Sequence, residues 1–304
     1  MDVYLPIANL SVNGLFIVAL GALTGVLSGM FGVGGGFLTT PLLIFYGVPP
    51  TVAAASAASQ VTGASVSGVF AHSRRGGVDY HMGAVLVAGG VIGSGIGAML
   101  FRLLQGLGQI DTVINVLYVA LLGSIGVLMA RESLQAIRAD RSGVPVPPRK
   151  RRHHPMVANL PLRWRFYRSG LYISPLAPLL LGVATGILTM LMGIGGGFVL
   201  VPAMLYILGM SASVVVGTSL FQILFVTMVT TMMHAMTTRA VDIVLAVLLL
   251  LGSVSGAQVG TQLAQKASPV KLRLVLAGIV LLIAARMLLG LAWRPDEIYT
   301  VAPL

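Results

Sequence analysis

A glycine-rich hexapeptide occurs twice in this chain, as GVGGGF at residues 32–37 and as GIGGGF at residues 193–198. The surrounding residues repeat as well, because TGVL at 24–27 matches TGIL at 185–188 and Pro41 matches Pro202. With one residue inserted, Gln60 aligns with Gln222 and His72 with His234. Self-similarity of this kind, carried on to Gly97 and Gly260, indicates that the chain is built from two related halves.

The composition indicates that lipid surrounds most of the chain. Of the 304 residues, 57% are hydrophobic and only 9% are charged, and the mean hydropathy is +0.96. Apolar segments recur at about 20 residues, the length that crosses a hydrocarbon core of about 30 Å. The backbone must satisfy its own hydrogen bonds there, so the segments are expected to be helices.

The apolar segments come in equal numbers in the two halves. An odd number of segments in each half turns the second half upside down relative to the first. We therefore expect an all-α polytopic membrane protein, with about ten transmembrane or re-entrant helices in two inverted five-helix repeats. The expected divisions are a first repeat at 1–130, a basic cytoplasmic loop at 131–170 and a second repeat at 171–304. The segments lie near 11–31, 35–48, 51–71, 82–104, 111–130, 172–192, 196–209, 212–234, 242–264 and 271–292.

The positive charge is concentrated between the two halves. The net charge is +11, and ten of the 19 Lys and Arg residues lie in 131–168. This distribution is typical of a cytoplasmic loop that obeys the positive-inside rule, so both termini are predicted outside a cell (inner) membrane. It does not indicate a nucleic-acid partner. The ten residues are Arg131, Arg138, Arg141, Arg149, Lys150, Arg151, Arg152, Arg163, Arg165 and Arg168.

Groups that carry enzyme chemistry are scarce. The chain has no cysteine, which excludes disulfides and thiolate chemistry within it. No Asp or Glu lies deep within a predicted span, and a membrane enzyme would normally need a carboxylate, a thiol or a metal cluster. We therefore predict no enzyme activity, no catalytic residue, no metal and no cofactor.

The glycine clusters are the first candidates for a binding site. They are Gly34, Gly35 and Gly36 with their copies Gly195, Gly196 and Gly197. Each glycine in a helix interior costs about 1 kcal/mol relative to alanine, so the clusters predict breaks in the helices. A short helix then starts near each cluster, with Pro41 or Pro202 near its beginning. The N–H groups at such a helix end can bind an anion without a cationic side chain; the alternative is a tight turn that serves packing alone.

Polar side chains on the third segment of each half are the second candidates. They are Ser56, Ser59 and Gln60, with Thr218, Ser219 and Gln222 at the corresponding positions. Residues four apart, as Ser56 and Gln60 are, share one face of a helix. Amides and hydroxyls could donate to the oxygen atoms of an anion, or they could bond between helices.

Two histidines and a set of glycines complete the candidates. His72 and His234 could couple transport to protons, or could simply be interfacial residues. Asp79 and Asp242, which follow them, are predicted to cap the next helices. Glycines at every fourth position predict close helix packing; they are Gly89, Gly93, Gly97, Gly252, Gly256 and Gly260.

Together these motifs resemble the sulfite exporter TauE/SafE family of membrane permeases, whose core is duplicated in the same way. The resemblance rests on the two glycine clusters with their prolines, on residues 72–79, on GTSL at 217–220 and on the glycine-spaced helices. It implies movement of sulfite, sulfonates or related organosulfur anions. The sequence departs from exact duplication where Ala240 stands in place of Gly77.

The predicted function is that of a secondary transporter, a permease that moves sulfite or a related small organosulfur anion by alternating access. The predicted partners are this small anion and the lipid bilayer. An anion channel, an uptake permease for sulfonates or other organic acids, a membrane enzyme and an accessory factor are the alternatives. The oligomeric state, the direction of transport and the coupling stay open.

Overall fold

The computed structural model describes residues 2–31, 34–141, 164–266 and 269–292. Six helices in these ranges are long and apolar enough to cross a membrane, so the chain is a helical, multi-pass membrane protein. Most of the predicted loop, residues 142–163, lies outside the described residues, as do both ends of the chain.

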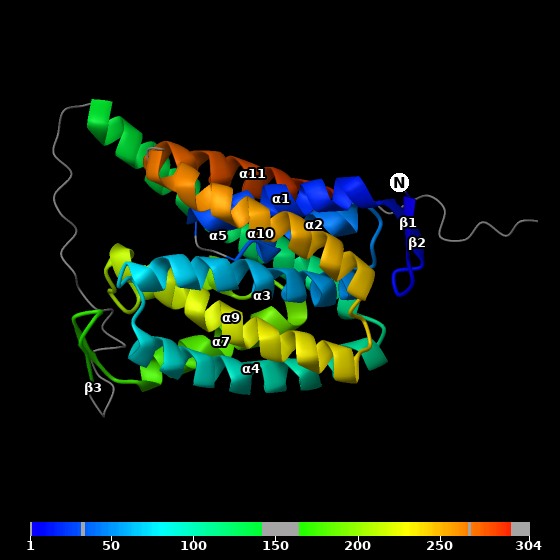
Figure 1. Cartoon of the computed structure of the whole chain (residues 1–304), viewed down its shortest axis with the longest axis horizontal. Coiled ribbons are helices and arrows are strands. Elements are labelled where there is room, and N and C mark those ends of the chain that lie inside the picture. The colour runs from blue at the N-terminus through cyan, green and yellow to red at the C-terminus, as the bar shows by residue number, and fades with distance from the viewer. Residues whose placement is uncertain (1, 32–33, 142–163, 267–268, 293–304) are drawn as a thin grey trace, which may run out of the picture.

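The first half consists of a β-hairpin followed by five helices (Figure 1). Its fifth helix continues past the apolar segment that ends at 130, through a stretch rich in good helix formers such as Arg, Glu, Leu and Ala. The elements are β1 (Asp2–Leu5), β2 (Leu10–Asn13), α1 (Gly14–Phe31), α2 (Gly36–Phe45), α3 (Pro50–Arg74), α4 (Tyr80–Gly106) and α5 (Ile110–Arg141).

The second half repeats this order of elements. It also opens with an antiparallel hairpin, in which Trp164 pairs with Ile173. The elements are β3 (Trp164–Phe166), β4 (Leu171–Ile173), α7 (Leu176–Met192), α8 (Gly197–Tyr206), α9 (Ala212–Thr237), α10 (Ile243–Lys266) and α11 (Pro269–Ala292).

The second helix of each half is too short to span a membrane. Both α2 and α8 contain ten residues, which corresponds to a rise of about 15 Å, about half of a hydrocarbon core of ~30 Å. Pro41 and Pro202 lie inside these helices and not in their first turns, so the prediction that placed them near the helix starts is wrong.

Helices from different halves pack in pairs. The helix α1 lies along α10, α4 along α7, α5 along α11, and α3 along α9. Glycines permit the first two contacts: a Cβ at Gly89 would lie 2.2 Å from the carbonyl oxygen of Leu179, and one at Gly252 would lie 2.0 Å from that of Val18. The prediction that these glycines serve helix packing is thus confirmed.

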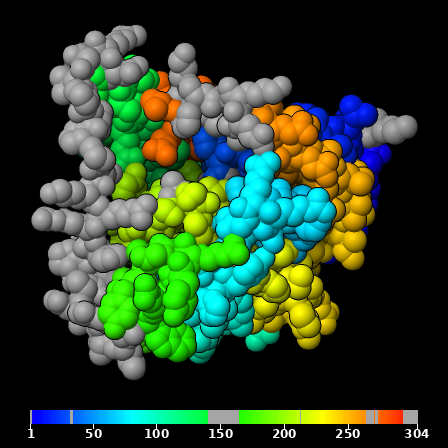
Figure 2. All heavy atoms as spheres, turned by 60° about the vertical axis from the view of Figure 1, so that its left-hand side comes forward, coloured from blue at the N-terminus to red at the C-terminus, as the bar shows by residue number. Residues whose placement is uncertain are grey.

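The two hairpins lie at opposite ends of the helices (Figure 1). The hairpin β3–β4 lies beside the end of α3, where Arg168 donates to the carbonyl oxygen of Gly76 at 2.7 Å. Figure 2 shows this end, with the hairpin in bright green next to α3 in cyan. The hairpin β1–β2 lies at the other end, beside the start of α10, where Asp242 accepts from the N–H of Ile7 at 3.0 Å.

Both predicted caps are present. Asp79 accepts from the N–H of Met82 at 3.1 Å at the start of α4, and Asp242 accepts from that of Leu245 at 3.1 Å at the start of α10. Each carboxylate therefore satisfies a helix N–H that has no partner within its own helix. The prediction of capping is confirmed in both halves.

Candidate functional site

The glycine clusters form the breaks that the sequence predicts. Gly34 and Gly35 have φ of 88° and 65°, and Gly195 and Gly196 have φ of 70° and 71°. Residues that carry a side chain rarely adopt this left-handed region of φ, so glycine suits the backbone path at these four positions. Each break ends one helix and starts the short helix of its half, α2 or α8.

The two breaks lie against each other in the middle of the molecule. A Cβ at Gly36 would lie 2.7 Å from the carbonyl oxygen of Gly193, in the other half. Phe37 and Phe198, the second residues of α2 and α8, stack with ring centroids 4.7 Å apart. The N-termini of the two short helices therefore meet at one place.

The start of α8 presents backbone donors that the protein does not use. Residues 195–198 are all buried, and among the described residues none of their N–H groups donates a hydrogen bond of ordinary geometry, although residues 195–196 form a turn that starts at Ile194. Buried N–H groups are rarely left without a partner. Successive N–H groups at the positive end of a helix are groups that bind anions in proteins.

The two glutamines lie beside these breaks. The amide nitrogen of Gln60 donates to the hydroxyl of Thr24 at 3.0 Å, and that of Gln222 lies 3.5 Å from the hydroxyl of Thr185. The same threonines touch the breaks: a Cβ at Gly35 would lie 3.1 Å from the carbonyl oxygen of Thr24. A Cβ at Gly196 would likewise lie 2.8 Å from the Cβ of Thr185.

Each glutamine also keeps one polar atom without a partner. Both side chains are fully buried, and the Oε1 atoms of Gln60 and Gln222 accept no hydrogen bond in the described part of the chain. A buried polar atom without a partner lowers the stability of the fold by about 1–3 kcal/mol. In native structures such an atom commonly bonds to a water or a ligand. The same atom is unsatisfied in both halves.

The hydroxyls of the third helices are used by the fold. Ser56 accepts from the N–H of Asp242 at 3.1 Å, and Thr218 accepts from that of Asp79 at 3.0 Å. Ser59 donates to the carbonyl oxygen of Ser56 on its own helix. Ser219 does the same toward Val216. A contact between these hydroxyls and a substrate stays a prediction.

The two histidines have different surroundings. His72 is partly exposed near the end of α3. His234 is completely buried, with its Nε2 3.0 Å from the carbonyl oxygen of Met190 and its ring edge-on to Phe101. Proton coupling by either residue stays a prediction.

Residue-by-residue interpretation of the sequence missed the threonines. Thr24 and Thr185 hold the glutamines, and Thr62 donates to Thr227 at 2.8 Å between α3 and α9. The signal for the first pair was present, since both threonines stand in the repeated TG(V/I)L stretch. Thr62 had no such signal, because its counterpart in the second half is Leu224.

Comparison with known proteins decides the family. The family model for the sulfite exporter TauE/SafE matches residues 17–287. The chain belongs to the TauE/SafE family. The matched region includes both glycine breaks and both glutamines, so the geometry described above lies within the part that defines this TauE/SafE protein.

Relatives of this TauE/SafE chain carry names of transporters. The probable membrane transporter protein YjnA of Bacillus subtilis is 28% identical over 90% of this chain and 98% of its own length. A probable membrane transporter protein of Xylella fastidiosa is 27% identical over 84% of this chain and 86% of its own length. One from Methanocaldococcus jannaschii is 23% identical over 90% and 94%. No solved structure matches the chain significantly.

Proposed function

We propose that the chain is a secondary transporter that moves sulfite, or a related small organosulfur anion, across the cytoplasmic membrane by alternating access. Membership of the TauE/SafE family supports a membrane transporter. The proposed substrate site lies at the two glycine breaks and includes Gln60 and Gln222. The observation that carries the proposal is the run of unused, buried N–H groups at the start of α8.

These donors favour an anion over a neutral or cationic substrate. Backbone N–H groups and the positive end of a helix dipole stabilise negative charge, and this effect is strongest where water is excluded. The site has no basic side chain among residues 193–198. A site made of dipoles binds an anion without forming an ion pair with it. This suits a transporter, which must also release the anion.

The glutamines offer adjustable groups at the same place. With the nitrogen turned toward Thr24, the free Oε1 of Gln60 can accept a hydrogen bond, for example from a protonated anion. After half a turn of the amide, the Thr24 hydroxyl can leave the carbonyl oxygen of Leu20 and donate to Oε1, and the nitrogen then faces the site as a donor. Gln222 and Thr185 have the same choice in the other half.

The proposed rocking motion rests on an inverted relation between the halves. Each half starts with a hairpin, and the two hairpins lie at opposite ends (Figure 1). The first helix of each half packs on the fourth helix of the other. Inverted halves that meet around a central site of broken helices are the usual arrangement for alternating access.

Charge supports the proposed orientation. Arg74, Arg75, Arg165 and Arg168 lie at the end of the helices that carries β3–β4, since Arg168 bonds to Gly76 there. The end of α5 and the start of α11 lie at the same end (Figure 1), and Arg273, in the second turn of α11, pairs with Glu132 of α5 at 3.7 Å. Fewer arginines of the described residues lie at the opposite end. By the positive-inside rule the β3–β4 end is proposed to face the cytoplasm.

The experiment measures flux of radiolabelled sulfite into liposomes that contain the purified chain, with sulfate and a small sulfonate as competitors. The test variant is Gln60→Met/Gln222→Met, which keeps side-chain volume but removes both amides. We expect saturable sulfite uptake by the unaltered chain and a loss of at least tenfold in the double variant. The matched control, Gln105→Met, makes the same change at an exposed glutamine outside the site.

The outcomes separate the alternatives. Flux that does not saturate and far exceeds the turnover of a carrier would replace the transporter with an anion channel. Saturable uptake of the sulfonate with none of sulfite would make the chain a sulfonate permease. No movement of any tested anion under imposed proton and voltage gradients would contradict the proposal and favour an accessory role.

A further inference from the structure

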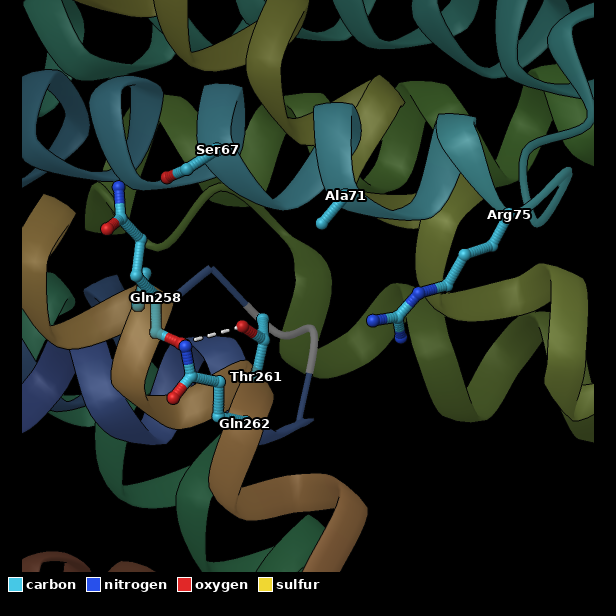
Figure 3. A pocket seen from close by; sticks show the side chains of 7 residues that line it. Ser67, Ala71, Arg75, Gln258, Thr261 and Gln262 are labelled. Carbon is cyan, nitrogen blue, oxygen red and sulfur yellow. Dashed lines mark hydrogen bonds between the residues drawn. The ribbon is translucent and has the colours of Figure 1, made fainter.

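A pocket opens between α3 and α10, away from the glycine breaks. Its volume is about 270 Å³, close to the lower end of ligand pockets at about 300–1,000 Å³, so it suits a small solute with some of its water. Figure 3 shows the side chains from the two helices facing each other across this space. The residues that line it are Ser67, Ala71, Arg75, Ala257, Gln258, Thr261 and Gln262.

Five of the seven residues that line this pocket are polar, and the one charged residue among them is basic. Arg75 brings a guanidinium, and Gln258 and Gln262 bring amide groups that can donate to an anion. The hydroxyls of Ser67 and Thr261 already donate to carbonyl oxygens of their own helices. Of the residues that line the pocket none is acidic, so an anion is favoured over a cation.

The pocket is aligned with the central site. Ser67, Ala71 and Arg75 follow one another at intervals of four residues, and Gln60 stands seven residues before Ser67, so all share one face of α3. At its outer end the pocket lies by Arg75, at the end of the helices that also carries the β3–β4 hairpin. It therefore points from this end toward the buried glutamine.

Leu250 packs on α3 between the pocket and that glutamine. Leu250 of α10 packs on Gly63 of α3, since its Cδ1 and Cγ atoms lie 2.8 and 2.9 Å from the position of a Cβ at Gly63. Gly63 stands between Gln60 and Ser67 on the helix, and Leu250 stands two turns before Ala257, which lines the pocket. This contact lies where a path between the two sites would pass.

The other half lacks most of these polar groups, although Ser94 stands where α10 has Ala257. The repeat places Val229 and Met233 of α9 where α3 has Ser67 and Ala71. On α4 it places Gly95, Ala98 and Met99 where α10 has Gln258, Thr261 and Gln262. A duplicated fold alone would produce two similar surfaces, so the polar pocket is a special property of the α3–α10 side.

We propose that this pocket, the α3–α10 vestibule, is a second binding site that receives the transported oxyanion at the β3–β4 end, and that Leu250 on Gly63 is the barrier between it and Gln60. This inference rests on the proposed function. The vestibule concentrates anions by the charge of Arg75 and holds them by the two amides. Movement of Leu250 away from Gly63 then admits the anion to the central site.

The test measures the half-saturation concentration of sulfite from each side of oriented vesicles. For Arg75→Gln/Gln258→Leu we expect this concentration to rise about tenfold on the β3–β4 side, because a charge-assisted hydrogen bond and an amide contact are lost. On the opposite side it should stay within twofold. Arg74→Gln is the matched control. It removes an equal charge at the preceding residue, but Arg74 lies over the ring of Phe70 and does not line the vestibule.

The result also distinguishes this inference from the proposed function. If the unaltered chain moves sulfite but the double variant keeps its half-saturation concentration on the β3–β4 side, the vestibule is not a binding site. An equal rise for Arg74→Gln would likewise overturn it, since surface charge would then explain the effect. If the unaltered chain moves no anion, the proposed function itself fails, whatever the variants do.

Discussion

The backbone N–H of Asp242 donates to the hydroxyl of Ser56 at 3.1 Å, so the start of α10 is held by a helix from the other half of the chain. The second half provides the equivalent contact, because the hydroxyl of Thr218 accepts from the N–H of Asp79 at 3.0 Å. All four residues are buried. The two halves are therefore joined by a pair of reciprocal hydrogen bonds, one near each end of the helices.

Removing these hydroxyls should weaken the junction between the halves. We expect Ser56→Ala and Thr218→Val each to lower the free energy of unfolding by about 1 kcal/mol, because a buried N–H loses its acceptor. Thermal unfolding in detergent measures the effect. Ser255→Ala is the control, because that hydroxyl bonds only to carbonyl oxygens of its own helix. An unchanged midpoint in both junction variants would show that these bonds do not stabilise the fold.

The carboxylate of Asp79 should fix the β3–β4 hairpin as well as its own helix. Its Oδ2 accepts from the N–H of Ser169 at 2.9 Å and from the hydroxyl of the same residue. In Asp79→Asn the amide NH₂ group replaces one of the two accepting oxygens. It then faces either the donors of Ser169 or, if the amide is turned, the N–H of Met82, and two donors cannot bond to each other. We expect a loss of about 1–3 kcal/mol in stability.

Hydrogen exchange locates that effect. In Asp79→Asn the amides of residues 166–173 should exchange faster, while those of the β1–β2 hairpin, which Asp242 holds, stay unchanged. Asp2→Asn, at an exposed carboxylate, is the control. If both hairpins exchange faster to the same degree, the contact to Ser169 is not what holds β3–β4.

Much of the helical order could be predicted from the sequence, because lipid imposes long apolar runs. The run at 51–71 became α3 at Pro50–Arg74, and the run at 271–292 became α11 at Pro269–Ala292. The glycine clusters also predicted where helices break, since residues with a side chain rarely adopt the φ of 65–88° found at Gly34 and Gly35.

The hairpins and the pairing of helices could not be predicted in the same way. The strands β3 and β4 have three residues each, too few for an alternating pattern to stand out. Hydropathy says which segments enter lipid, but not which segment lies beside which. Each first helix, α1 or α7, packs on the fourth helix of the other half. This pairing depends on the shapes of the helix surfaces, because glycines of one helix contact backbone oxygens of the other.

That pairing predicts a sharp contrast between two glycines of α4. A Cβ at Gly89 would lie 2.2 Å from the carbonyl oxygen of Leu179, whereas one at Gly95 would meet nothing within 4 Å. We expect Gly89→Ala to push α7 away and to cost about 1–3 kcal/mol. Gly95→Ala should be neutral or stabilising by up to about 1 kcal/mol.

The midpoints of thermal unfolding of the two alanine variants test this contrast, together with the yield of monodisperse protein after extraction. The two changes are chemically identical and lie on one helix, so any difference reports the local packing. Equal midpoints would contradict the close contact between α4 and α7.

The orientation of the chain gives the last prediction, and the absence of cysteine makes it direct to measure. Tyr167, next to β3, is 80% exposed, and Leu107, between α4 and α5, is 62% exposed. The α4 helix starts at the β3–β4 end and finishes at the other, so these two positions lie on opposite sides of the membrane. In intact cells, a membrane-impermeant maleimide should label Leu107→Cys and leave Tyr167→Cys unlabelled until the membrane is permeabilised. The reverse pattern would place the arginine-rich end outside, against the positive-inside rule, and the vestibule would then receive its anion from the exterior.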